Sequence, residues 1–212
     1  MDYKVMMRKE LDRMWKHLLN FGESEDEDDE DEEVRLKALC SVILHGASEV
    51  GDLKKIVLII DKILPKFGVK INIDEPINQS NQTALMSASR EGYPDIVIFL
   101  LKNNANANAV RTRDDSPLIL VSQNSIMDKD VQLTIIESLI SAGADVNHIG
   151  EYGKTPLILA TESNSPKIVS KLLLFGADIS IRDKNGSTAL DIAMDWEYED
   201  IIQNIMEYQN DS

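Results

Sequence analysis

The sequence has little of what disulfide-bonded, metal-binding or membrane-spanning proteins need. Its 212 residues include one cysteine, Cys40, which excludes an internal disulfide and argues against a secreted, disulfide-stapled fold. The three histidines lie in separate segments, and none has the spacing to another His or Cys that a zinc site requires. The longest apolar run, residues 56–64, is broken by Asp61 and Lys62 and is too short to span a bilayer. We therefore predict no metal site and no membrane span.

Signals for catalysis, for nucleic-acid binding and for export are also missing. The sequence contains no Gly-x-Ser-x-Gly, Walker-type or dinucleotide-binding loop. It also lacks the clustered Lys and Arg residues that bind nucleic acid by counter-ion release. No signal peptide precedes the first polar segment, so we expect an intracellular protein, cytoplasmic or nuclear. We predict no catalytic residue, no cofactor and no nucleic-acid partner.

The net charge of −15 is concentrated in one tract, residues 23–33. This tract holds ten of the 37 acidic residues; without it, 27 acidic residues face 22 basic ones, a net charge of −5. Such a run repels itself and has no apolar side chain to pack, which predicts a disordered linker or tail. Its role is spacing and solubility, or alternatively contact with a basic partner. Ser24, followed by three acidic residues, also resembles an acid-directed kinase site.

A short motif recurs along the rest of the chain. Thr155-Pro156-Leu157 is echoed at residues 83–85, 116–118 and 188–190, at spacings of 33, 39 and 33 residues. Gly143-Ala144-Asp145 recurs at residues 176–178 and more loosely at 104–106. A period of about 33 residues with two short helices per unit is typical of a solenoid.

These motifs resemble the ankyrin repeat family over about residues 78–208, with a degenerate unit reaching back to about residue 34. The resemblance implies an all-α solenoid of stacked helix-turn-helix units with short hairpin loops, about five units in all. The domain prediction is an N-terminal amphipathic helix (1–22), an acidic linker (23–33), a degenerate first repeat (34–77), an ankyrin repeat (78–110), one with an insertion (111–149), a further repeat (150–182) and a capping repeat (183–212).

The N-terminal helix is predicted from Met7, Leu11, Met14 and Leu18, which share one helical face beside Trp15. It either covers the apolar edge of the first repeat or detaches and docks into a groove of a partner. Its basic residues and Trp also allow binding to a membrane surface or to a calmodulin-type protein.

The degenerate first repeat is predicted as two helices whose connecting turn carries Gly46 and Gly51. Gly68 is expected to end the second helix. Cys40 is then a small buried apolar residue rather than a nucleophile.

The third repeat is 39 residues long, so it carries about six extra residues around 123–130. We place them in the turn between its helices, as a contact site or as a neutral insertion. The last repeat ends in polar residues, as a solenoid cap does, and we expect no C-terminal effector box after it.

Family members usually bind partners through the hairpin tips and the exposed end of each first helix. Carried over position by position, the resemblance implies these partner-binding residues: Arg90, Glu91, Arg113, Asp115, Gln123, Tyr152, Lys154, Glu162, Lys184, Asn185, Asp195 and Trp196. Tyr152, Arg113, Arg90 and Trp196 are of the types that most often dominate interfaces, although Trp196 also fits packing on the C-terminal cap. Asn147 follows Leu139 at the spacing of asparagines hydroxylated in many such repeats; alternatively, it only hydrogen-bonds the hairpin.

We therefore predict a non-catalytic module that binds another protein and is monomeric when unbound: an adaptor, an inhibitor or an assembly factor. The alternative is a structural subunit of a larger assembly, anchored by the N-terminal helix.

Overall fold

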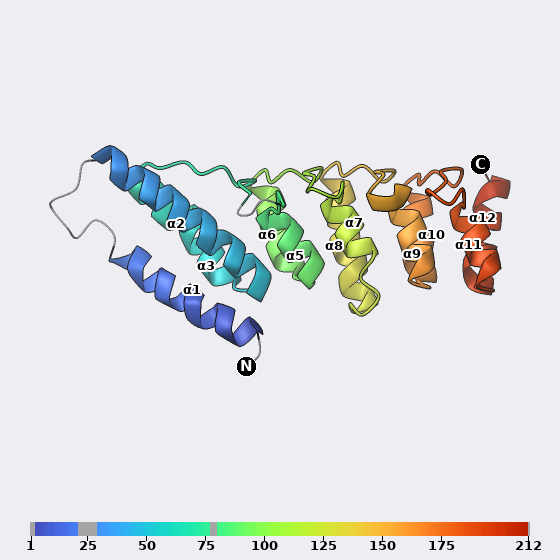
Figure 1. Ribbon diagram of the computed structural model, residues 1–212, viewed down its shortest axis with the longest axis horizontal. Coiled ribbons are helices and arrows are strands. Elements are labelled where there is room, and N and C mark those ends of the chain that lie inside the picture. The colour runs from blue at the N-terminus through green and yellow to red at the C-terminus, as the bar shows by residue number, and fades with distance from the viewer. Residues whose placement is uncertain (1–2, 21–28, 77–79, 212) are drawn as a thin grey trace. The chain divides into compact units, whose positions relative to one another are not determined.

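The computed structural model describes residues 3–20, 29–76 and 80–211. Every regular element in these ranges is helical, as the sequence predicts (Figure 1). The chain divides into two compact units, unit 1 (residues 1–105) and unit 2 (residues 106–212). No helix in the described ranges has both the length and the hydropathy of a membrane span.

Unit 1 begins with α1 (Tyr3–Leu19), which packs along α2 (Asp29–Val50), and α2 in turn packs against α5 (Ala84–Glu91) (Figure 1). Leu11 and Leu18 are the buried residues of α1. A second helical stretch runs through α3 (Leu53–Leu58), a π-helical segment (Ile59–Ile63) and α4 (Leu64–Phe67). The next helix, α6 (Pro94–Lys102), pairs with α5.

The helix α2 differs from its prediction at both ends. It starts at Asp29, so residues 29–33 of the predicted acidic linker are helical; acidic residues at a helix N-terminus are favoured by the helix dipole. It also continues through Gly46, and the turn comes only at Gly51, whose φ is +82°. Gly46 has a packing role instead, since a Cβ there would lie 3.1 Å from Leu11 Cδ1 of α1.

The π-helical segment was not predicted, but Pro65 explains it. Proline lacks an N–H and clashes with the carbonyl four residues before it, so a regular α-helix cannot continue through this position without a break in its hydrogen bonds. Here the Leu64 amide donates to the carbonyl of Ile59, five residues back, which widens the helix just before Pro65. Gly68, with φ +67°, ends the stretch as expected.

Unit 2 contains three helix pairs: α7 (Pro117–Ser122) with α8 (Lys129–Ser141), α9 (Pro156–Glu162) with α10 (Pro166–Leu174), and α11 (Ala189–Asp195) with α12 (Glu199–Asp211). The first helices pack in the order α7, α9, α11, and the second helices in the order α8, α10, α12 (Figure 1). A 3-10 turn, Glu151–Gly153, precedes α9.

The recurring Thr or Ser caps the first helix of each pair. The hydroxyl oxygens of Thr83, Ser116, Thr155 and Thr188 each accept a hydrogen bond from the amide three residues on, at 3.1–3.3 Å. Three of the leucines that follow, Leu85, Leu118 and Leu157, are at most 1% exposed. Leu190 is part-exposed, because no further helix pair covers it in the described residues.

The second helices bury an isoleucine at one repeated position: Ile96, Ile135, Ile168 and Ile201, none more than 2% exposed. The six extra residues of the third repeat do not all lie in its turn. The connection between α7 and α8 is residues 123–128, and α8 has 13 residues where α10 has 9. The insertion therefore lengthens both the turn and the start of α8, where Asp128 accepts hydrogen bonds from the amides of Asp130 and Val131.

Two leucines of α10 provide a matched test of packing within unit 2. Leu172 is fully buried and Leu174 is 78% exposed. We expect Leu172→Ala to lower the free energy of unfolding by roughly 2–5 kcal/mol, and Leu174→Ala by less than about 0.5 kcal/mol. Urea denaturation followed by circular dichroism measures both, and equal losses would contradict the burial of Leu172 between the helix pairs.

Candidate functional site

Unit 2 carries a hollow of about 330 Å³ between the segment that precedes α7 and the segment that precedes α9. It brings together five of the predicted contact residues from two repeats: Arg113, Asp115, Gln123, Tyr152 and Lys154. The other lining residues are Arg111, Ile119, Glu151 and Leu159.

One predicted contact residue of this hollow has a structural role. Asp115 is only 5% exposed, and its carboxylate accepts hydrogen bonds from Arg111 Nε at 3.0 Å and Nη2 at 2.6 Å. The ion pair fixes the loop just before the Ser116 cap. Asp115 is therefore occupied within the chain, and the exposed cation of this loop is Arg113.

A second ion pair braces the wall made by α9. Lys154 Nζ lies 2.7 and 2.8 Å from the two carboxylate oxygens of Glu162, so the residues before and at the end of α9 are joined across its exposed side. Both side chains are about three-quarters covered. Two predicted contact residues thus lie at the site but are paired with each other.

The hairpin tips beside the hollow carry cations on both sides of an exposed tyrosine. Tyr152 is 58% exposed and has a left-handed φ of +60°. Arg113 on one side reaches Glu151 at 3.6 Å, while Lys184 on the other donates its amide to the Tyr152 carbonyl at 2.9 Å. Lys184 Nζ also lies 5.6 Å from the centre of the Tyr152 ring, within cation–π range. We call Arg113, Tyr152 and Lys184 the tip ridge.

The remaining predicted residues of unit 2 are not among those that line the hollow. Asn185 hydrogen-bonds Asp183 within its own turn. Asp195 is exposed at the end of α11, and Trp196 next to it packs edge-to-face on Tyr198 at 5.8 Å while staying 57% exposed.

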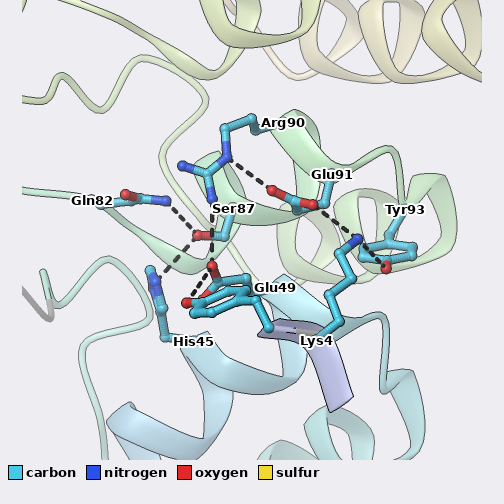
Figure 2. Close-up of polar contacts among 9 residues, drawn as sticks. Lys4, His45, Glu49, Gln82, Ser87, Arg90, Glu91 and Tyr93 are labelled. Atoms are coloured by element: carbon cyan, nitrogen blue, oxygen red, sulfur yellow. Dashed lines mark hydrogen bonds and ion pairs between the residues drawn. The ribbon is translucent and has the colours of Figure 1, made fainter. Parts of the chain in front are cut away.

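Arg90 and Glu91 lie in unit 1 and are engaged there with α1 and α2 (Figure 2). Lys4 lies 3.0 Å from Glu91 and donates to the Tyr93 hydroxyl at 3.3 Å, while Arg90 pairs with Glu91 at 3.0 Å and with Glu49 at 3.6 Å. Burial alone would raise the pKa of Glu91, but hydrogen bonds from Lys4 and Arg90 outweigh it and lower that pKa. These two predicted contact residues therefore attach α1 and α2 to the end of α5.

A buried hydrogen-bonded group lies next to this network. Ser87 Oγ is 3.2 Å from His45 Nε2 and accepts from Gln82 Nε2 at 2.8 Å (Figure 2). Desolvation lowers the pKa of His45, so the imidazole is neutral at pH 7. Serine beside histidine is a nucleophile pattern, but both side chains are buried between α2 and α5, where no substrate reaches them.

Cys40 is likewise buried, as predicted, and burial raises the pKa of its thiol to about 11.

The asparagines after the Gly-Ala-Asp motif link successive hairpins of unit 2. Asn147 accepts from the Asp178 amide at 2.8 Å and donates to the Gly176 carbonyl at 3.4 Å. Asn108 makes the same two contacts one repeat earlier, to Asp145 and Gly143. Asn147 thus hydrogen-bonds the hairpin; its hydroxylation stays a prediction. Ser24 lies outside the described residues.

Repeated caps, repeated isoleucines and this asparagine ladder describe one structural unit used several times. Family models agree: ankyrin repeats (3 copies) match residues 125–212, and ankyrin repeats (many copies) match residues 69–121. The chain belongs to the ankyrin repeat family. Repeats of this family generally mediate protein–protein interaction.

Three curated relatives show the range of proteins that contain similar repeats. An ankyrin repeat protein of fowlpox virus is 37% identical over 69% of this chain and 43% of its own length. The human ankyrin repeat and SOCS box protein 6 is 31% identical over 59% of this chain and 30% of its own length. The human transient receptor potential cation channel subfamily A member 1 is 32% identical over 73% of this chain and 13% of its own length. The chain thus spans less than half the length of each of these relatives.

The network of Figure 2 makes a testable prediction about α1. Glu91→Gln removes the charge that holds Lys4, so amide hydrogen exchange in α1 should speed up several-fold. Glu10→Gln is the control, because Glu10 pairs with Arg13 inside α1 and, among the described residues, with no residue of another helix. Exchange detected by mass spectrometry compares the two variants, and equal rates in α1 would contradict the anchoring role.

The same variant tests how the stabilisation of α1 by the Glu91 carboxylate depends on pH. A carboxylate whose pKa is lowered in the folded state stabilises at pH values above its unfolded pKa, and this contribution is lost as the pH falls through the folded value. After division by the intrinsic exchange rate at each pH, the protection of the α1 amides should therefore fall more between pH 7 and pH 3 in the wild type than in Glu91→Gln.

Proposed function

We propose that this chain is a non-catalytic interaction module, an adaptor, inhibitor or assembly factor, whose partner binds across the tip ridge and into the hollow of unit 2. The observation that carries the proposal is the tip ridge itself. Arg113 is 69% exposed and only loosely paired, and Tyr152 is 58% exposed, with its backbone carbonyl accepting a hydrogen bond from the Lys184 amide. Arginine and tyrosine are the residue types that most often dominate protein interfaces.

The rigidity of the site supports a role in recognition. The Arg111–Asp115 and Lys154–Glu162 pairs fix the two walls of the hollow before any partner arrives. A preorganised surface loses less conformational entropy on binding, which favours affinity. The non-catalytic part of the proposal is supported by the burial of Ser87, His45 and Cys40, the residues closest to a nucleophile pattern.

The chemistry of the ridge indicates the class of partner. Arg113 and Lys184 are cations exposed on an otherwise acidic chain, and they lie on either side of one aromatic ring. A protein segment with carboxylates on both sides of an apolar residue complements this arrangement. We therefore propose an acidic segment of a partner protein as the ligand of unit 2.

The alternative, a structural subunit anchored by the N-terminal helix, has less support. Leu11 and Leu18, the buried residues of α1, pack within unit 1, and Lys4 is paired with Glu91. The two leucines that anchor α1 are therefore not available to an assembly, while Val5, Met6 and Leu19 of the same helix are exposed.

Photo-crosslinking tests the proposal directly. A photo-reactive amino acid replaces Tyr152 in one sample and Lys167, on the exposed side of α10, in the control. In native extract, crosslinks from position 152 should capture one protein, identified by mass spectrometry, that position 167 does not. Equal capture by both positions would contradict a partner on the tip ridge.

The captured partner, once purified, then allows a quantitative test. Arg113→Ala with Tyr152→Ala should weaken its binding at least about tenfold, the loss expected for interface residues worth more than 1 kcal/mol each. Lys167→Ala with Gln203→Ala, which alters only exposed positions of α10 and α12, should leave binding unchanged. If both double variants bind like the wild type, the ridge is not the contact surface.

A further inference from the structure

A second surface, independent of the tip ridge, lies in unit 1 between α1 and α3. A groove of about 850 Å³ runs here, with the end of α2 as its floor. Its apolar lining comes from three helices, α1, α2 and α3: Leu11, Val50, Leu53, Val57 and Leu58. Leu58 is 43% exposed, and Leu53 and Val57 are partly exposed.

Two apolar residues of α3 lie at positions whose character varies among the second helices. Counting from the residue that precedes each second helix, Val57-Leu58 corresponds to Ile98-Phe99 in α6, to Ser170-Lys171 in α10 and to Gln203-Asn204 in α12. In unit 2 these positions contact the preceding second helix, since Lys171 pairs with Glu137 of α8 and Asn204 donates to the Pro166 carbonyl of α10. On α3 they are aliphatic, and no described helix covers Leu58. An exposed aliphatic residue such as Leu58 in an apolar groove indicates a surface that another molecule covers.

A neighbouring position of α3 departs from the repeat pattern. Where α6, α10 and α12 bury an isoleucine three residues after the residue that precedes the helix, α3 has Lys55. Its ammonium group lies 2.9 Å from Asp12 of α1 and 2.7 Å from Asp52, and 5.9 Å from the Trp15 ring. This lysine spans from α3 to α1, so the two walls of the groove are joined by an ion pair instead of a continuous apolar contact. The ion pair therefore holds α1 and α3 apart at the groove.

The occupant that fits this groove is a helix. In unit 2 the second helix α10 lies between two other second helices, α8 and α12. In unit 1 α1 packs along α2, a first helix, so the side of α3 that faces α1 has the groove where a second helix would pack. Residues Leu53 and Val57, four apart on α3, form the ridge against which such a helix packs.

The charges at the rim select the kind of helix. Asp12 and Asp52 share one partner, Lys55, and the ionic residues that line the groove are three cations, Lys55 with Arg8 and Lys54, against these two carboxylates. Arg8 donates only to the Val50 carbonyl at 3.2 Å, and in the part of the chain that the structure describes neither Arg8 nor Lys54 forms an ion pair. Two cations without carboxylate partners beside an apolar floor complement an amphipathic helix with acidic flanks. We propose that the groove between α1 and α3 binds an acidic amphipathic helix of a partner protein.

The test uses the full chain with Trp196→Phe, which leaves Trp15, next to the groove residue Lys55, as the single tryptophan. The probes are two synthetic 18-residue amphipathic peptides with the same leucine stripe, one flanked by glutamates and the other by lysines. The glutamate peptide should shift the Trp15 emission saturably and bind at least about tenfold tighter than the lysine peptide at low salt. The net charge of −15 favours the opposite order, so this preference isolates the groove.

Variants locate the binding. Leu58→Asp should weaken the glutamate peptide at least about tenfold, and Lys54→Glu should do so without altering any apolar contact. Leu174→Asp, at an exposed leucine of α10, is the matched control and should bind like the parent. Thermal melting checks that each variant is folded, and Lys54→Glu decides the matter if Leu58→Asp unfolds.

Three results would overturn the proposal. The first is a lysine peptide that binds as tightly as the glutamate peptide, or tighter. The second is a wild-type dimer in sedimentation velocity that Leu58→Asp dissociates, which would assign the groove to a second copy of this chain. The third is failure of the glutamate peptide together with Leu58-dependent binding to vesicles of phosphatidylcholine and phosphatidylserine, which would assign it to a membrane surface. Since none of these involves Arg113 or Tyr152, each leaves the proposed function of unit 2 unaffected.

Discussion

The structure depends on apolar contact between neighbouring helix pairs, because no pair has a core of its own. The second helices α6 and α10 are nine residues long, and isolated helices of that length are marginal in water. Ile135, Ile168 and Ile201 are buried where α8, α10 and α12 meet, and the leucines of the first helices are buried alongside. Once these contacts hold the pairs together, the hairpins project in a fixed order, and their tips gain the rigidity that recognition requires.

The same constraint explains how the described chain differs from a regular array. The first repeat of unit 1 has no helix pair before it in the described residues, so α1 covers α2 and Gly46 allows its close approach. The polar contacts of Lys4 and Arg90 then replace part of the apolar contact that a preceding repeat would supply (Figure 2). On α3, Lys55 stands in place of the repeated isoleucine, and a groove remains. The proposed surfaces, one in each unit, would give an adaptor two separate contacts.

Sequence reasoning recovered the features that a repeated pattern encodes. Caps such as Thr155, core positions such as Leu157 and the ladder residue Asn147 recur at a fixed spacing, and the structure confirms their contacts. Sequence reasoning could not show that Asp115 and Glu91 are paired inside the chain. Whether Arg111 and Lys4 come close enough to pair with them depends on how the segments pack. The helix through Gly46 was missed because glycine signals a turn, while in this helix its small size serves packing against Leu11. The groove was missed for a related reason: whether Leu58 is covered depends on how α1 and α3 pack, which a sequence pattern does not show.

Hydrogen exchange after a single core substitution tests most directly whether the helix pairs of unit 2 stabilise one another. Ile168 is fully buried in α10, which packs against both α8 and α12. If stability resides in the contacts between pairs, Ile168→Ala should speed amide exchange in α8 and α12 as well as in α10, each by at least about tenfold for a loss of roughly 1.4 kcal/mol or more. Faster exchange confined to α10 would show that each pair is stable by itself and would contradict the mutual stabilisation of neighbouring pairs.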